Sequence, residues 1–193
     1  MTTVSFQAAF EALRDRLDEH AWAHCERVAL ASGELAAAYG VDTALASLAG
    51  LLHDWDRELS ADELLAAATE AGIALTPADE ALPYLLHART GAHGIAEALP
   101  QVPAEVLSAV SRHTLGSPDM SDLEMVVFVA DMIEPAREYP GVDELRSVVG
   151  SVSLGELFFR AYQQSIAHLV SARRYIHPET VAVWNALVAG GRR

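Results

Sequence analysis

The sequence of 193 residues contains no lysine, a single cysteine and no long hydrophobic run. All 13 basic residues are arginines, against 27 acidic residues, which leaves a net charge of −14. Because nucleic-acid binding needs lysine and arginine to displace phosphate counterions, this acidity argues against nucleic acid as a partner. A small, highly phosphorylated ligand is compatible with it if a metal or a local arginine cluster supplies positive charge.

The other absences exclude further classes of protein. Cys25 has no second cysteine to pair with, which excludes an internal disulfide framework and predicts a reducing, cytoplasmic location. No apolar segment reaches the roughly 18–20 residues of a membrane-spanning helix, so no membrane association is expected. The first ten residues lack the regions of a signal peptide. The GxxxxGKS/T, HExxH and GxGxxG motifs are also missing.

Apolar residues recur at helical spacing almost throughout, so the sequence predicts one all-α domain over residues 1–193. Its core is expected at about 19–187, with a mobile tail at 188–193. Capping residues and apolar spacing predict helices over 6–17, 20–39, 43 to about 55, 61 to about 72, 103–113, 121–135, 142–149, 153–172 and 178–189. Pro83, Gly91 and Gly94 predict that the stretch 77–100 is broken into two short helices with a bend.

Eight histidines are the one oddity of the composition. Four of them, with two aspartates in apolar surroundings, lie on separate predicted helices: His24, His53, Asp54, His87, His113 and Asp131. A carboxylate in an apolar environment is unfavourable unless it is paired or bound to a cation. Imidazole and carboxylate groups suit transition metals, and six ligands fit two ions that share a carboxylate. Taken singly, each histidine could equally be a solvated or hydrogen-bonded core residue.

Five segments resemble, in order, blocks of a known family. They are HAWAHCERV, AGLLHDWDR, LPYLLHARTGAHG, AVSRHTLGSPDMSDLEMVVFVADMIEPAREYPGVDELR and PETVAVWN. The resemblance is to the YqeK-type HD hydrolases, which are symmetrical diadenosine tetraphosphate hydrolases, and it runs from about residue 19 to 187. It implies an HD-domain helical bundle with a dimetal centre, and cleavage of diadenosine tetraphosphate into two ADP.

The same resemblance implies a role for each of the six residues named above. His24, His53 and Asp131 would hold one metal ion, and His87 and His113 the other. Asp54 would lie between the two ions. The family implies iron most often, with manganese or other transition metals as alternatives.

The residue types also predict a mechanism. Two metal ions would acidify a bridging water to hydroxide and bind the phosphate oxygens, so no protein nucleophile is needed. The predicted catalytic residues are Asp54 and Arg57. Arg57 stands where the family usually has lysine, three residues after the aspartate of the HD pair.

A substrate with four phosphates needs positive charge beyond that of the metals. The candidate phosphate-binding residues are Arg27, Arg57, Thr114 and Arg137. Each arginine could instead be a salt-bridged residue, with Glu26, Asp56 and Glu138 as the nearest partners in sequence. His93 is expected near the site but not as a ligand. The other histidines, Cys25, Trp55 and Trp184 are expected to have structural roles.

Other functions are also compatible with the sequence. The chain could be another HD phosphohydrolase that acts on nucleotides or cyclic dinucleotides, an HD-type di-iron oxygenase, or a non-catalytic nucleotide-binding protein. The expected ligand is a dinucleoside polyphosphate or a nucleoside diphosphate. The sequence leaves the oligomeric state open, a homodimer included.

Overall fold

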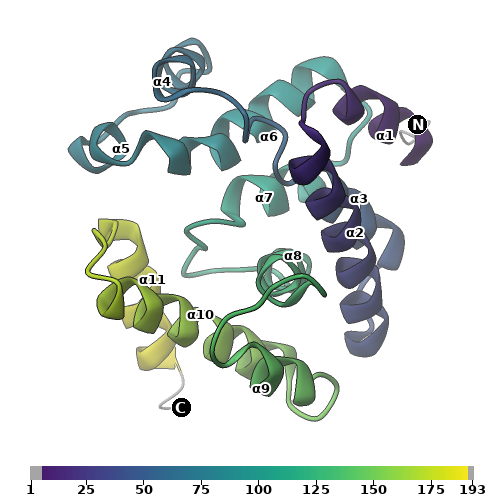
Figure 1. The fold of residues 1–193 in the computed structure, drawn as a ribbon, viewed down its shortest axis with the longest axis vertical. Helices are drawn as coiled ribbons and strands as arrows, with labels where there is room; N and C mark the ends of the chain where they lie inside the picture. Colours follow the sequence, from purple (N-terminus) through teal and green to yellow (C-terminus); the bar gives the residue numbers. More distant parts are fainter. Residues whose placement is uncertain (1–5, 191–193) are drawn as a thin grey trace.

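The computed structural model describes residues 6–190, which form α-helices and one short 3-10 helix (Figure 1). The elements are α1 (Phe6–Arg14), α2 (Glu19–Tyr39), α3 (Thr43–Leu52), α4 (Ala61–Glu70), α5 (Pro77–Ala81), η1 (Pro83–Leu86), α6 (His87–Ala98), α7 (Ala104–Arg112), α8 (Asp122–Ile133), α9 (Val142–Ser147), α10 (Leu154–Ser171) and α11 (Pro178–Gly190). No strand occurs among these residues, which confirms the all-α prediction.

The predicted helix starts are confirmed by their caps. The side chains of Asp42, Ser60, Ser121 and Ser153 each accept a hydrogen bond from a backbone N–H in the first turn of the helix that follows. The cap predicted at Ser5 lies outside the described residues. Within residues 6–190, no helix is both long and apolar enough to cross a membrane.

Several predicted helices end earlier than expected, as α1 does at Arg14, and two further predictions need correction. Helix α11 continues to Gly190, so the predicted tail does not begin at 188, and residues 191–193 lie outside the described part. Pro83 does interrupt the stretch 77–100, but Gly91 and Gly94 lie inside the continuous helix α6. A Cβ added at Gly94 would lie 3.1 Å from Nε1 of Trp55. These glycines therefore let α6 approach the segment after α3 closely, and they do not break the helix.

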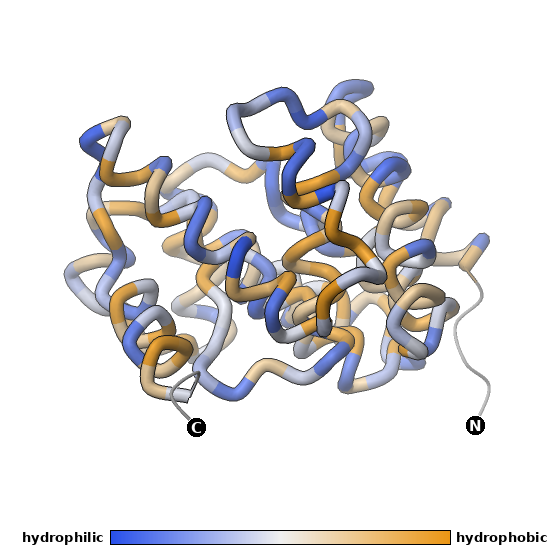
Figure 2. Tube along the Cα trace, turned by 90° about the horizontal axis from the view of Figure 1, so that it is seen from below, coloured by the Kyte–Doolittle hydropathy of each residue, from blue (hydrophilic) through white to orange (hydrophobic). Residues whose placement is uncertain are grey.

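Helix α8 lies in the middle of the bundle and contacts α2, α3, α7, α9 and α10 (Figure 1). Its residues from Val126 to Ala130 are all buried. Hydrophilic and hydrophobic stretches alternate along much of the chain, as is typical of amphipathic helices (Figure 2). The bundle thus packs α2, α3 and α7 around one buried helix, and α6 packs against α7.

Candidate metal centre

The six predicted ligands come from five segments, and most of them lie at the ends of helices. The helical part of α3 stops at Leu52, and His53 and Asp54 follow in a turn. His87 is the first residue of α6, and His113 follows the last residue of α7. His24 and Asp131 lie within α2 and α8, respectively. The structure brings all six together.

The two carboxylate oxygens of Asp54 face two different sets of histidines. Oδ2 lies 3.3 Å from Nε2 of His53 and 3.7 Å from Nε2 of His24. Oδ1 lies 3.1 Å from Nε2 of His87 and 3.6 Å from Nε2 of His113. Asp54 therefore stands between two groups of nitrogen ligands, with one oxygen for each.

Asp131 completes the first of these groups. Its Oδ1 lies 3.0 Å from Nε2 of His24 and 3.9 Å from Nε2 of His53. The candidate ligand atoms of His24, His53 and Asp131 lie within 4.8 Å of one another, and so do those of Asp54, His87 and His113. This grouping is the one that the family resemblance implied.

Backbone carbonyls orient three of the four imidazoles. Nδ1 of His53 donates to the carbonyl of Gly50 (2.8 Å), and Nδ1 of His113 donates to that of Val110 (2.7 Å). His87 bonds in the same way to the carbonyl three residues before it, at 2.6 Å. Because a carbonyl only accepts, the proton of each neutral ring sits on Nδ1. Nε2 is then left as a lone pair that faces the centre.

His24 is oriented by the carboxylate of Glu134, which was not among the residues predicted from the sequence. Its Nδ1 lies 3.1 Å from Oε1 of Glu134, which is 3% exposed. Glu134 is itself held by Nε of Arg27 at 2.7 Å and by the backbone N–H of Ala136 at 2.8 Å. Histidines that bind metals commonly donate their other ring N–H to a carboxylate, which fixes the orientation of the ring. In the sequence, only the position of Glu134 three residues after Asp131 indicated that it could lie near the site.

The donor set fits metal ions because several of its buried atoms have no other partner. Nε2 of His53 and Oδ1 of Asp54 are buried and make no hydrogen bond. Nε2 of His87 lies 3.1 Å from Nε2 of His113, and both are lone-pair atoms in the tautomers that the carbonyls fix. Two facing lone pairs and unpaired buried oxygens are unfavourable unless a cation binds between them.

The ionisable groups of the centre shift one another's pKa values. Burial by itself would raise the pKa of Asp54, but the positive charge of His53 and the nearby rings of His113 and His87 hold it well below its usual value. Burial would likewise lower the pKa of His53, but the charge of Asp54 raises it well above its usual range. Without a cation this ring therefore holds a second proton on Nε2, which a bound metal ion would displace. The pKa of Asp131 is also lowered, by His24, His53 and Arg137 against the effect of burial. The carboxylates are therefore available as anionic ligands.

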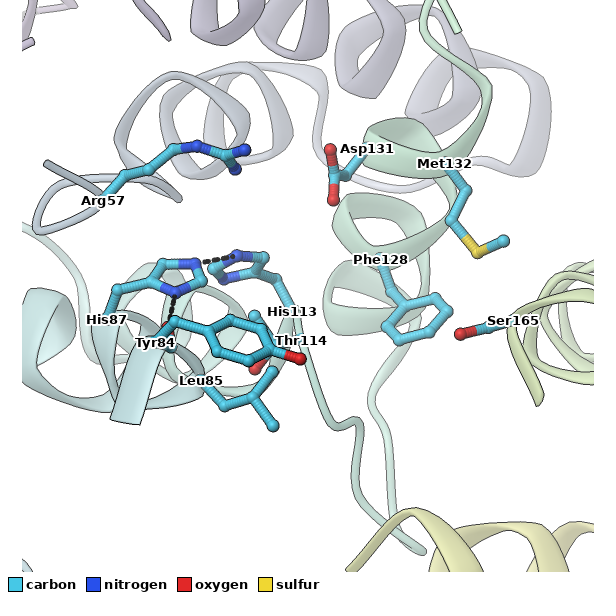
Figure 3. Close-up of a pocket in the computed structure, with 10 residues that line it drawn as sticks. All are labelled: Arg57, Tyr84, Leu85, His87, His113, Thr114, Phe128, Asp131, Met132 and Ser165. Atoms are coloured by element: carbon cyan, nitrogen blue, oxygen red, sulfur yellow. Dashed lines mark hydrogen bonds between the residues drawn. The ribbon is translucent and has the colours of Figure 1, made fainter. Parts of the chain in front are cut away.

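A cavity of about 430 Å³ opens over this centre. The residues that line it are Arg57, Tyr84, Leu85, His87, His113, Thr114, Phe128, Asp131, Met132 and Ser165 (Figure 3). Figure 3 shows His87, His113 and Arg57 on one side of this cavity, and Met132 and Ser165 on the other. The cavity gives a ligand direct access to atoms of both metal-ligand groups.

The four candidate phosphate-binding residues lie in different places. Arg57 and Thr114 line the cavity over the centre. Nη1 of Arg57 lies 2.8 Å from Oδ2 of Asp54. Arg137 pairs with Asp131 and borders a neighbouring cavity. Arg27 lines neither cavity and instead holds Glu134.

The sequence-nearest partners proposed for the arginines were therefore wrong. Arg27 pairs with Glu134 and not with Glu26, because Glu134 is buried beside it whereas Glu26 is exposed. Likewise, Arg57 pairs with Asp54, since Asp56 is held by Arg16 at 2.9 Å.

Arg137 differs from its expected pairing in the same way. Its ion pair is with Asp131, six residues before it, and not with Glu138. Glu138 is exposed. All three arginines thus pair with a carboxylate of the centre or with Glu134, which contacts His24.

The residues that were expected to be structural are packed as predicted. Cys25 is buried, and burial raises the pKa of its thiol. Trp55 is 3% exposed, with the guanidinium of Arg16 4.5 Å from its ring centre. Trp184 stacks on Phe159 with ring centres 5.6 Å apart.

Two of the remaining histidines contact other carboxylates. His177 is buried, with Nε2 3.6 Å from Oδ1 of Asp79. His93 has a half-exposed side chain whose Nδ1 is 3.8 Å from Oε2 of Glu97. Among the described residues, neither belongs to the groups that could hold a metal.

Known proteins resemble the chain over nearly its whole length. Residues 21–136 match the HD domain family. A protein of Halalkalibacterium halodurans named "Bis(5'-nucleosyl)-tetraphosphatase, symmetrical" is 32% identical over 93% of this chain and 95% of its own length. A protein of Bacillus subtilis with the same name is 29% identical over 95% of this chain and 98% of its own length.

A solved structure has the same fold. It is the crystal structure of a predicted HD superfamily hydrolase involved in NAD metabolism from Clostridium acetobutylicum. The two chains superpose with a TM-score of 0.89 and 30% identity, over 100% of each.

Proposed function

This chain belongs to the HD domain family, and on that premise we propose that it is a metal-dependent hydrolase of dinucleoside tetraphosphates. It adds water across the central phosphoanhydride of diadenosine tetraphosphate and releases two molecules of ADP. Two relatives matched over nearly their full length carry the name of this activity.

One observation carries the proposal. The carboxylate of Asp54 stands between two groups of ligands, and both groups border a cavity that also contains Arg57. Two positive ions side by side are suited to an anhydride that has phosphate charge on both sides of the bond to be broken.

We assign His24, His53 and Asp131 to one ion, His87 and His113 to the other, and Asp54 to both. Two such ions, when bound, would lower the pKa of a water and neutralise charge on the phosphate oxygens. Imidazole with carboxylate suits several transition metals, and iron is the proposed occupant, with manganese as the alternative.

The protein's own residues would orient the reactants. Arg57, which lines the cavity, would bind phosphate oxygens on the side of His87. Its guanidinium can make two parallel hydrogen bonds to a phosphate, which a lysine ammonium cannot. Thr114 would donate its hydroxyl to the same chain of phosphates. Arg27, through Glu134, would hold His24 and not the substrate.

The test is product analysis with protein purified without added chelator or metal. The protein should contain about two transition-metal ions per chain, and iron should dominate. It should convert diadenosine tetraphosphate into ADP alone. ATP with AMP, or no turnover by metal-loaded protein, would contradict the proposal. Oxygen consumption with an organic substrate would instead indicate an HD-type oxygenase. A cytoplasmic location stays a prediction, which fractionation of cells would check.

A further inference from the structure

A second cavity adjoins the one over the metal centre. It has a volume of about 510 Å³ and lies between α10 and the segment that joins α8 to α9. Asp131, Met132 and Ser165 line both cavities, so the two are neighbours along one wall. Each volume lies within the usual range of small-molecule sites, about 300–1,000 Å³.

We propose that this second cavity binds one of the two nucleosides of the substrate. The other nucleoside then occupies the first cavity, and the central anhydride lies between them at the metal centre. The inference rests on the proposed function and adds to it the residues that hold the second half of the substrate.

The walls of the second cavity suit a purine nucleoside. Most of its surface is apolar and comes from Met132, Tyr139, Pro140 and Ala167. The hydroxyl of Tyr139 donates to the carbonyl of Met132 at 2.9 Å, which fixes the ring and leaves its apolar face for contacts. Polar groups at the cavity come from Gln164, His168 and Ser171. A purine has flat apolar faces and a polar edge, so it matches such a lining.

Positive charge lies where the chain of phosphates would pass. Arg137 lines the second cavity, and its Nη2 lies 3.5 Å from Nε2 of His24 at the metal centre. Arg57 lines the first cavity. The two cavities thus contain one arginine each, on a chain whose net charge is −14. Each arginine can offset part of the phosphate charge of one half of the substrate.

Two adjacent sites would also explain cleavage in the middle. Diadenosine tetraphosphate has two identical halves, so equal halves on either side of the metals place the central bridge at the ions. A single nucleoside site would fix only one end of the substrate. With both ends held, hydrolysis to ATP and AMP would require the substrate to leave one cavity.

The test is a pair of matched substitutions on the exposed surface of α10. Ala167 lines the second cavity, whereas Gln163 is exposed and lines neither cavity. Ala167→Trp should fill the cavity, and Gln163→Trp adds the same side chain elsewhere on the helix. Both metal-loaded variants are assayed with diadenosine tetraphosphate and with adenosine 5′-tetraphosphate, which lacks the second nucleoside.

Ala167→Trp should lower kcat/KM for diadenosine tetraphosphate at least tenfold relative to adenosine 5′-tetraphosphate, while Gln163→Trp leaves this ratio unchanged. Titration with ADP should give two sites per chain in the wild type and one in Ala167→Trp. Equal losses for both substrates, or one ADP per wild-type chain, would overturn the inference. Absence of any hydrolysis by the wild type would contradict the proposed function instead, and the ADP titration would still decide whether the second site exists.

Discussion

Nε2 of His53 lies 3.3 Å from Oδ2 of Asp54, although adjacent residues on a regular helix point about 100° apart. The helix ends one residue earlier, at Leu52, and the turn that follows lets both side chains face the same centre. The carbonyl of Gly50 fixes the ring of His53 in that position. The end of α3 therefore brings two neighbours in sequence to one candidate metal centre.

Asp54→Asn should remove metal as well as activity. The amide keeps the shape of the side chain, but its nitrogen cannot serve as a ligand, so the link between the two groups of histidines is lost. We expect fewer than two metal ions per chain and a rate of ADP formation lower by at least about 100-fold. Elemental analysis and product chromatography measure these quantities.

Asp56→Asn is the matched control for that experiment. Asp56 is also buried, but it pairs with Arg16, away from the centre. This variant should lose stability and keep its two metal ions. A full metal content in Asp54→Asn would refute the shared-carboxylate assignment.

Glu134→Gln should weaken metal binding without removing a ligand. The carboxylate of Glu134 lies 3.1 Å from Nδ1 of His24 and fixes both the ring and its tautomer. Loss of such a partner lowers metal affinity or activity by about 10–100-fold. Competition with a chelator measures the affinity. Glu26→Gln on the exposed face of α2 makes the same change in charge and should have no effect; equal affinities in the two variants would show that Glu134 only supports the fold.

Two substitutions of Arg57 test whether activity depends on its positive charge or on the planar shape of its guanidinium. Arg57→Ala should lower kcat by about 100-fold, as loss of one donor to a developing anion usually does. It also leaves Oδ2 of Asp54 without its 2.8 Å ion pair. Arg57→Lys should keep most of the activity, because a lysine ammonium would also bring a positive charge to the phosphate oxygens. Steady-state kinetics with diadenosine tetraphosphate compare the three proteins; full activity in Arg57→Ala would make the ion pair purely structural.

The sequence predicted the helices and the clustering of the six candidate ligands, because both depend on local patterns. Caps such as Ser121 act within one turn of a helix. The sequence segments around His53 and Asp54 can likewise be recognised without knowledge of how the helices pack. Contacts across the chain were not predictable in this way. Glu134 lies 110 residues from His24. Gly94 was taken as a helix breaker because its close contact with Trp55 exists only in the folded protein.

Asp79→Asn should make the protein less stable at neutral pH but not in acid. Asp79 is buried and pairs with Arg89. Its carboxylate accepts hydrogen bonds from the backbone N–H and the hydroxyl of Thr76, the residue that caps α5. Burial would raise the pKa of Asp79, but the bonds from Thr76 and the charges of Arg89 and His177 lower it. The carboxylate therefore stabilises the fold above its unfolded pKa, near 4, and this contribution is lost as the pH falls through its lower folded pKa.

We expect a loss of about 3 kcal/mol for Asp79→Asn at pH 7, as for other broken buried pairs. The difference from the wild type should shrink steadily between pH 4 and the acid limit. Thermal unfolding followed by circular dichroism at several pH values measures it. Asp15→Asn, at an exposed position, should show no such trend; a pH-independent difference at Asp79 would mean that packing, and not charge, is responsible.

Gly50→Ala should destabilise the protein although alanine is the better helix former. A Cβ at Gly50 would lie 2.8 Å from the carbonyl oxygen of Val28 and 2.5 Å from Oγ of Ser32, so α2 and α3 would have to move apart. Such overpacking costs about 1–3 kcal/mol, more than the ~1 kcal/mol that helix propensity contributes. Gly155→Ala is the control, since a Cβ there meets no atom within 4 Å and should leave stability equal or higher. Urea denaturation gives both values. Because the carbonyl of Gly50 also orients His53, the first substitution should lower metal content too, and an unchanged metal content would show that the ring keeps its position when the helices shift.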